Sequence, residues 1–574
     1  MTQSCEKLFD YLGHFGRFQA CIYFASIFQA ISCGIHYLAS VFIAITPKHV
    51  CNVPGNVTSV LLANSSSNRI EDAWELWTSA KDYLVVQLEN GEVWELTQCS
   101  RTRREDAFNL TYDYEGPRST QSCSDGFLYD QTKLESSIVT DWDLVCERAW
   151  LAKLAQPTFM LGVLFGAVIF GDIADRVGRR PVMWFTSSGQ FLFGVAVAFT
   201  FDYYSFVIVR FLLAMVSSGY LVVVFVYVTE YVGIKARTWA SMHVHAAFAV
   251  GVMIVALVGY LVRTWWIYQV CLSITTLPFI IFCWLLPETP FWLLSQGRHE
   301  EVEKLINVME KWNNISTPCK LSELCPTHQD EPVSEITEKK KKAPSVKNHN
   351  LLDLFRTCTM ARRTFSIWLV WFTGSLGYYV FSLSSVNLGG NEYLNLFLSG
   401  AVELPSYIVA CLGMDRLGRR NTLAPFLLLS AVICGIIMVI PQDFSALQIA
   451  ASMTGKFTIG VAFGLIYLYT AELYPTIVRS LAVGSGSMMC RIGSVVAPFC
   501  VYLADVWVFM PQLLVGFMAL LTGALTLMLP ETLGEPLTST MEEAAALGAR
   551  RDRRAQKEET AFSDVALEKL EAPV

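Results

Sequence analysis

The chain has 574 residues, of which 53% are hydrophobic and only 16% are charged, and its formal net charge is −7. A soluble domain contains about 25% charged residues, so this composition excludes an ordinary soluble enzyme. The negative net charge, without a concentrated basic face, also excludes a nucleic-acid-binding protein. Apolar residues gather into runs of about 20, the length that crosses a hydrocarbon core of about 30 Å. The chain is therefore predicted to be a polytopic membrane protein.

The apolar runs predict twelve membrane-spanning helices, so the expected fold class is an all-α membrane protein. The predicted spans are 20–46, 152–172, 181–201, 205–231, 240–262, 265–286, 365–386, 393–412, 421–441, 447–471, 481–503 and 507–530. Residues 1–19 carry several charges, and no small-residue cleavage site follows the first run. The first span is therefore expected to be retained and not removed as a signal peptide.

The distribution of Lys and Arg sets the predicted orientation. One set of short loops contains nine of these residues, and the opposite set contains only Arg263. Cytoplasmic loops carry the excess of positive residues, so the first set and both termini are predicted to be cytoplasmic. The predicted organisation is a cytoplasmic N-terminus at 1–19, helix 1 at 20–46, an extracellular loop at 47–151, helices 2–6 within 152–286, a cytoplasmic linker at 287–364, helices 7–12 within 365–530 and a cytoplasmic tail at 531–574.

The large extracellular loop has the chemistry of an oxidising compartment. Its cysteines predict two disulfides, and the sequence leaves all three pairings open: Cys51, Cys99, Cys123 and Cys146. Three sequons predict glycosylation at Asn56, Asn64 and Asn109. In the cytoplasmic linker, five apolar residues between Val302 and Trp312 recur at helical spacing. They predict an amphipathic helix that lies on the membrane or on the helix bundle.

An internal repeat divides the chain into two halves. Asp-Arg-Val-Gly-Arg-Arg at 175–180 recurs as Asp-Arg-Leu-Gly-Arg-Arg at 415–420, after 240 residues. Three further pairs recur at nearly the same offset: Arg210 and Lys456, Glu230 and Glu472, and the Pro-Glu-Thr segments at 287–289 and 530–532. Four landmarks at nearly one offset indicate two duplicated six-helix halves. Parallel repeats of this kind are typical of transporters that bind substrate near the membrane midplane, between the halves.

These motifs resemble a known family. The segment 171–180 is similar to the loop motif of the major facilitator superfamily. The cysteine-bearing glycosylated loop, Pro-Glu-Thr-Pro at 287–290 and the segment 471–479 resemble the organic ion transporters of solute carrier family 22. The resemblance implies two six-helix repeats in the major facilitator fold, with the large extracellular loop after helix 1. It implies a transporter and not an enzyme.

Charged residues deep in the spans are the first candidates for substrate contact, because charges inside a bilayer are costly. Arg491 lies about 16 Å from the cytoplasmic end of its span by helical rise, and Glu403 and Lys456 reach similar depths. The cation-selective branch of the family has an aspartate at the position of Arg491. A guanidinium group suits a carboxylate. For each of the three charges the alternative is an interhelical ion pair, and for Glu403 a further alternative is coupling to a proton or cation.

A quaternary ammonium group prefers aromatic faces, and Tyr378 and Tyr467 are the candidates for this role. Tyr378 matches a binding-site tyrosine of the family. A zwitterion that carries trimethylammonium and carboxylate groups, such as carnitine, fits this combination. Charged residues at the cytoplasmic helix ends are expected to form gating ion pairs: Asp175, Arg176, Arg179, Arg180, Glu230, Arg237, Asp415, Arg416, Arg419, Arg420, Glu472 and Arg479.

The resemblance thus implies a plasma-membrane carrier that moves carnitine and related organic cations by alternating access. The chain has no Gly-x4-Gly-Lys loop for ATP, and we expect no cofactor and no metal ion. The expected partners are a small zwitterion or organic cation and the lipid bilayer, with a coupling ion (Na⁺ or H⁺) needed for accumulation, and no nucleic acid. Two alternatives are left open: an organic-anion exchanger of the same fold and a transport-inactive membrane sensor.

Overall fold

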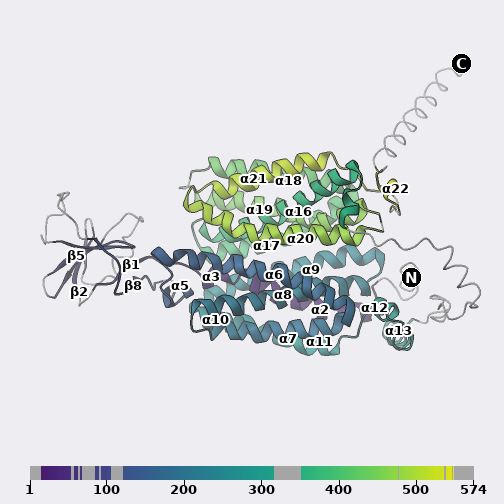
Figure 1. The fold of residues 1–574 in the computed structure, drawn as a ribbon, viewed down its shortest axis with the longest axis horizontal. Coiled ribbons are helices and arrows are strands. Elements are labelled where there is room, and N and C mark those ends of the chain that lie inside the picture. Colours follow the sequence, from purple (N-terminus) through teal and green to yellow (C-terminus); the bar gives the residue numbers. More distant parts are fainter. Residues whose placement is uncertain are drawn as a thin grey trace, which may run out of the picture.

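The computed structural model describes two groups of helices that lie side by side, with a small β-sheet region at one end (Figure 1). The described residues are 15–53, 57–62, 65–67, 84–89, 92–104, 120–132, 134–315, 351–441, 443–475, 477–535, 538, 540–545 and 547. Within them, the side chains of 57–62, 65–67, 84, 104, 234–238, 241 and 283 are not described.

Eleven helical segments of the described chain are long and apolar enough to cross a membrane. In the first half they are formed by α2 (Arg17–Leu38) with α3 (Ser40–Ile43), α6 (Ala149–Val177), α8 (Tyr203–Tyr231), α9 (Ile234–Leu261), and α10 (Trp265–Ile274) with α11 (Leu277–Leu285). In the second half they are α16 (Cys358–Ser384), α17 (Glu392–Arg416), α18 (Arg419–Val439), α19 (Ser445–Leu473), α20 (Arg479–Tyr502) and α21 (Met510–Leu527). The prediction of a helical membrane protein is confirmed.

One further helix, α7 (Arg179–Ala198), packs against α8, α10 and α11 but is not among the eleven apolar segments. Its buried face includes three polar side chains, Thr186, Ser187 and Gln190. Gln190 accepts a hydrogen bond from Gln29 of α2 at 3.0 Å and donates one to Ser32 at 3.1 Å, while Ser187 donates to Gln29 at 3.2 Å. These bonds satisfy polar groups between helices and explain the low hydropathy of α7. The predicted count of twelve spans depends on this helix.

The two halves meet along two helix pairs, α9 with α17 and α6 with α20. Each pair joins one helix of the first half to one of the second. At the end that carries the sheet region, the ring of Phe42 stacks on Tyr393 with centroids 4.9 Å apart, and Tyr260 contacts Tyr393 at 5.8 Å. Lys153 and Asp505 form an ion pair between the halves at the same end. The halves are therefore in contact at this end of the bundle.

The sheet region lies between α3 and α6. Six antiparallel strands have the order β3-β2-β4-β5-β6-β7: β2 (Val57–Leu62), β3 (Ser65–Ser67), β4 (Leu84–Leu88), β5 (Val93–Leu96), β6 (Arg101–Arg104) and β7 (Thr120–Gln121). A separate pair joins β1 (His49–Cys51) to β8 (Phe127–Tyr129). Two short helices, α5 (Ile138–Asp141) and η1 (Cys146–Arg148), lead into α6. The predicted glycosylation sites Asn56, Asn64 and Asn109 lie outside the described residues.

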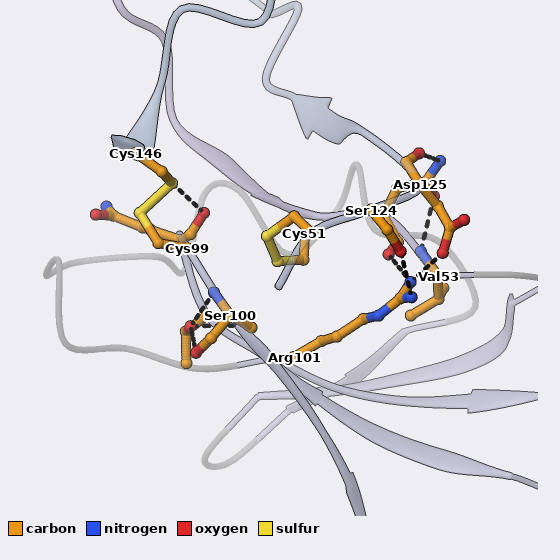
Figure 2. Close-up of a disulfide and its surroundings, with 12 residues drawn as sticks. Cys51, Val53, Cys99, Ser100, Arg101, Ser124, Asp125 and Cys146 are labelled. Carbon is orange, nitrogen blue, oxygen red and sulfur yellow. Dashed lines mark hydrogen bonds and ion pairs between the residues drawn. A yellow bond between two sulfur atoms is a disulfide. The ribbon is translucent and has the colours of Figure 1, made fainter. Parts of the chain in front are cut away.

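Two disulfides bind this region together (Figure 2). Cys51 is bonded to Cys123, and Cys99 is bonded to Cys146. The first bond lies beside the β1–β8 pair, because Cys51 is opposite Phe127 in the sheet register. The second ties the turn before β6 to the start of η1 and therefore to the first turns of α6. This is one of the three pairings that the sequence left open.

The disulfide pairing can be checked by peptide mapping with mass spectrometry. Proteolysis of the non-reduced protein should release peptides that join Cys51 to Cys123 and Cys99 to Cys146, and no other pair. Replacing Cys99 and Cys146 together by serine should lower stability by about 2–5 kcal/mol, because the crosslink restricts the unfolded chain. Surface expression and thermal melting would measure this loss. A crosslink between Cys51 and Cys99 would contradict the structure.

A short helical layer covers the opposite end of the bundle. It contains α12 (Pro290–Ser295), α13 (His299–Asn313), η2 (Leu351–Phe355) and α22 (Met541–Ala545). The apolar face of α13 is buried, with Val302 fully covered and Met309 1% exposed. Asn313 accepts a hydrogen bond from the backbone N–H of Phe18 at 3.0 Å. The predicted amphipathic helix thus lies on the bundle, against α2.

Candidate functional site

A cavity of about 490 Å³ lies between the two halves. Its wall includes Tyr37 of α2 and His245 of α9 in the first half, and Tyr378, Tyr467 and Arg491 of α16, α19 and α20 in the second. The cavity also reaches Asp175 and Arg179 of the first basic loop, at the end of α6 and the start of α7. We call this the basic-loop end. Because the halves touch at the sheet end, the cavity opens toward the basic-loop end.

Arg491 supplies an unpaired positive charge to this cavity. It follows the first residue of α20 by 12 positions, which places it about 18 Å along the helix. Its Nε atom is buried without a hydrogen-bond partner among the described residues. No carboxylate in the described part of the chain forms an ion pair with it. A guanidinium without a carboxylate partner on the wall of a cavity is suited to receive an anionic group.

Glu403 and Lys456 do not lie on the cavity wall. They form an ion pair with each other, with Lys456 Nζ 3.0 Å from Glu403 Oε1. The side chain of Lys456 is 1% exposed and that of Glu403 is 0% exposed. The pair joins α17 to α19 behind Tyr378. These contacts correspond to the interhelical ion pair that the sequence offered as the alternative to substrate contact. The geometry therefore brings Arg491, Tyr378 and Tyr467 together at the cavity and separates the other two candidates from it.

The buried pair holds Tyr378 from several sides. The Tyr378 hydroxyl donates to Glu403 Oε2 at 3.1 Å, and the Tyr407 hydroxyl donates to the same oxygen at 3.2 Å. Lys456 Nζ donates to the Tyr378 carbonyl at 3.2 Å and to Ser382 Oγ. It also lies 3.1 Å from the centroid of the Tyr378 ring. One cation already occupies a face of this ring, so the ring is a poor site for a second one.

Five aromatic side chains form a second feature of the wall, which we call the aromatic cluster: Phe225, His245, Tyr407, Phe463 and Tyr467. The His245 ring lies 5.7 Å from Tyr467, 5.8 Å from Tyr407 and 6.0 Å from Phe463, centroid to centroid. Phe225 lies 5.4 Å from Tyr467. Sequence reasoning singled out only Tyr467. The spacing of Phe463 and Tyr467, four residues apart on α19, is the signal that could have added Phe463.

The repeated basic loops form the same hydrogen-bond network twice. In the first half, Arg179 pairs with Glu230 at 3.1 Å and with Asp175 at 2.9 Å. In the second half, Arg419 pairs with Glu472 at 2.8 Å. Each arginine also donates to a carbonyl at the end of the preceding helix. Among the described residues all these ion pairs lie within one half, in agreement with a cavity that is open at this end.

The repeated Pro-Glu-Thr segments complete these networks. Glu288 accepts hydrogen bonds from the first two N–H groups of α7, both at 3.1 Å. Glu531 accepts two from the start of α18, at 2.8 and 3.2 Å. A carboxylate is favoured there because the N-terminus of a helix carries partial positive charge. Sequence reasoning used these segments only as landmarks, because each acid lies more than 100 residues along the chain from the helix that it caps.

The other predicted gating residues are distributed around this end. The Arg237 side chain is not described. The remaining ones are exposed or partly exposed: Arg176, Arg180, Asp415, Arg416, Arg420 and Arg479.

Gly178 and Gly418 allow the carboxylates to approach. Their φ angles are +114° and +98°, and an added Cβ would lie 2.5 Å from Glu288 Oε2 or 2.6 Å from Glu531 Oε2. Gly418→Ala is expected to lower the maximal transport rate several-fold. Its φ of 98° with ψ of 169° lies in a region that is essentially restricted to glycine, and another residue there costs about 1–3 kcal/mol even without the clash. The ratio of rates for different substrates should not change. Gly435→Ala is the matched control on α18, since its Cβ would meet open space. Equal effects of both changes would refute this role.

The comparisons with known proteins agree with this architecture. Residues 126–544 match the family model described as "Sugar (and other) transporter". The inward open conformation of the xylose transporter XylE from E. coli has a similar fold, with a TM-score of 0.52 at 16% identity over 72% of this chain and 91% of that chain. A partially occluded inward open conformation of the same transporter gives a TM-score of 0.52 at 18% identity, over 68% of this chain and 90% of that chain.

Full-length relatives narrow the family. "Solute carrier family 22 member 16" from Xenopus laevis is 74% identical over 99% of this chain and 98% of its own length. The Homo sapiens protein of that name is 57% identical over 99% and 97%. "Organic cation/carnitine transporter 2" from Homo sapiens is 34% identical over 94% and 93%. The chain is therefore a multi-pass membrane transporter and not an enzyme, and it belongs to the major facilitator superfamily and, within it, to solute carrier family 22.

Proposed function

We propose that this protein is a plasma-membrane carrier that moves carnitine and related organic cations by alternating access. One observation carries the proposal: an unpaired guanidinium and an aromatic cluster share a single cavity between the halves. A guanidinium binds a carboxylate through two parallel hydrogen bonds. An aromatic face attracts a quaternary ammonium by about 0.5–2 kcal/mol. Carnitine carries both groups.

The charges around the cavity favour one orientation of the bound substrate. Lys456 already occupies one face of Tyr378, and this ring lies on the same wall as Arg491. The positive side of the cavity therefore suits the carboxylate. The aromatic cluster has no cation on its rings in the described contacts, so it suits the ammonium group. We place the carboxylate at Arg491 and the trimethylammonium group against Tyr467 and Phe463.

In this proposal Glu403 and Lys456 are positioning residues. Their ion pair fixes the hydroxyls of Tyr378 and Tyr407 away from the cavity, so that the rings form its wall. Glu403 is then not the direct partner of the ammonium group. A role of this carboxylate in coupling to a proton or cation is compatible with the same contacts.

Alternating access requires that the two ends of the cavity open in turn. In this structure the contacts of Phe42, Tyr260 and Tyr393 and the ion pair of Lys153 with Asp505 hold the sheet end closed. We propose that the basic-loop end and both termini face the cytoplasm, as the excess of Lys and Arg predicts. The structure then corresponds to an inward-open state, and the outward-open state breaks the contacts at the sheet end.

Energetics decide whether the carrier can accumulate its substrate. A monovalent cation gains about 2.3 kcal/mol per 100 mV of membrane potential. Carnitine has no net charge, so the potential alone does not concentrate it. Accumulation of carnitine would therefore require a coupling ion, Na⁺ or H⁺, whereas two-way facilitated movement would not.

Uptake into expressing cells tests the proposal. Labelled carnitine, tetraethylammonium and p-aminohippurate should be compared in the same cells, with and without sodium, against cells that express no carrier. We expect saturable uptake of carnitine and of the cation. Uptake of p-aminohippurate alone would make the protein an organic-anion exchanger. If none of the three compounds is taken up although the protein is present at the cell surface, a transport-inactive sensor is favoured.

A further inference from the structure

His245 occupies an unusual place in the cavity. It belongs to α9 of the first half, yet three of its ring neighbours, Tyr407, Phe463 and Tyr467, belong to the second half. Phe225 lies on the remaining side at 6.3 Å. The imidazole therefore sits inside the aromatic cluster and bridges the two halves. The proposed function uses His245 only as one ring of the aromatic cluster and gives its charge no role.

The chemistry of the cluster depends on the charge of this ring. A neutral imidazole is one more aromatic wall for an ammonium group. A protonated imidazolium is itself a cation surrounded by aromatic rings, and it occupies the position that the substrate cation would take. The two cations would repel each other at this short distance in a site of low dielectric constant. Imidazole is the side chain that ordinarily changes charge between pH 5 and 8.

The other charged groups near His245 do not change in this range in the same way. Arg491 stays positive, and tyrosine hydroxyls and the Cys490 thiol ordinarily titrate at higher pH. Glu403 and Lys456 lie behind Tyr378 and Tyr407 and are paired with each other. Asp175 and Arg179 reach the cavity at the basic-loop end and are also paired. On α8, the neighbour that faces the imidazole is Phe225, which carries no charge.

We propose that His245 is a specificity-determining residue: its neutral form completes the subsite for organic cations, and its protonated form rejects them. The inference rests on the proposed function and deepens it. It predicts that acidification of the compartment to which the cavity opens weakens the binding of cations and leaves the binding of organic anions unchanged or stronger. A carrier of this kind releases organic cations more readily into acidic surroundings.

Equilibrium binding to the purified full-length protein tests this inference. Radiolabelled tetraethylammonium is the probe, because its charge does not depend on pH. The readout is the ratio of Kd values at pH 5.5 and pH 7.5. For the unaltered protein we expect a ratio of about ten, since imidazole changes charge across this range. For His245→Gln and His245→Phe we expect a ratio below about two, whatever their affinity at pH 7.5.

His243→Gln is the matched control, because His243 lies two residues away on α9, is exposed and bonds to the Trp239 carbonyl instead of lining the cavity. It should keep the ratio of the unaltered protein. If both His245 variants keep that ratio, or if both fold normally but bind no cation at any pH, the inference is wrong. If the unaltered protein binds neither tetraethylammonium nor carnitine at pH 7.5, the proposed function itself fails.

Discussion

Replacing Arg491 by alanine is expected to weaken carnitine transport by well over tenfold while sparing quaternary ammonium compounds that lack a carboxylate. Removing one partner of a buried, hydrogen-bonded charge pair commonly costs about 2–5 kcal/mol, and the substrate carboxylate is the partner proposed here. Choline keeps the trimethylammonium group and lacks the carboxylate. Its transport should be unchanged or improved, because a repulsive positive charge has left the cavity.

Arg491→Lys separates charge from geometry. Lysine keeps the positive charge but loses the planar fork that binds both carboxylate oxygens, so it should restore carnitine transport only in part. Both uptakes should be measured in the same cells and normalised to surface protein. Equal losses of carnitine and choline in the alanine variant would show that Arg491 has a structural role instead.

Breaking the ion pair of Glu403 and Lys456 from one side is expected to cause the second large loss. Removing one member of a buried pair costs about 3–5 kcal/mol, because it leaves an uncompensated charge, whereas replacing both members is often neutral. Glu403→Gln and Lys456→Met alone should therefore abolish most transport of every substrate. The double variant should recover a large part of it, because no buried charge is left.

The losses of carnitine and choline transport, compared in the same variants, show whether Glu403 and Lys456 position the wall or contact the substrate directly. A positioning pair affects carnitine and choline together. The double variant should show altered KM values, because Tyr378 and Tyr407 now have a neutral amide oxygen as acceptor in place of a carboxylate. A selective loss of carnitine in Lys456→Met would show that Lys456 binds the carboxylate directly. Failure of the double variant to recover while it still reaches the cell surface would show that Glu403 is required for its charge.

The sequence predicted how deep in the membrane the charged candidates lie, but not which of them face the cavity. Helical rise places Glu403, Lys456 and Arg491 near the middle of their spans. Which of them faces the cavity depends on the rotation of each helix, and this is set by packing against neighbouring helices. Only Arg491 faces the cavity in the structure. The ion pair was foreseen as an alternative for each charge, yet its two partners could not be identified without the contact between α17 and α19.

The aromatic cluster was harder to predict for a different reason. Aromatic residues make up 13% of the chain, and most of those in membrane helices face lipid or pack between helices. His245 was not among the candidate site residues that the sequence indicated. Its position among four rings follows from the meeting of α8 and α9 of the first half with α17 and α19 of the second.

The repeat was the strongest signal of the fold in the sequence, because equivalent residues of the two halves form equivalent ion pairs and helix caps. Arg179 and Arg419 each bind an acid on the neighbouring long helix, and Glu288 and Glu531 each cap a helix. The disulfide pairing, in contrast, depends on the register of β1 against β8, which brings Cys51 beside the segment that contains Cys123. That register joins residues more than 70 positions apart, and local patterns do not encode it.

The central claim is that carnitine lies in the cavity with its carboxylate on Arg491 and its ammonium group in the aromatic cluster. A cryo-electron-microscopy structure of the unaltered protein with carnitine bound tests it most directly. We expect carboxylate oxygens about 3 Å from the Arg491 guanidinium and the trimethylammonium group within about 6 Å of the ring centroid of Tyr467 or Phe463. A reversed substrate, with its carboxylate on Lys456 or its ammonium group on Glu403, or a substrate bound outside this cavity, would contradict it.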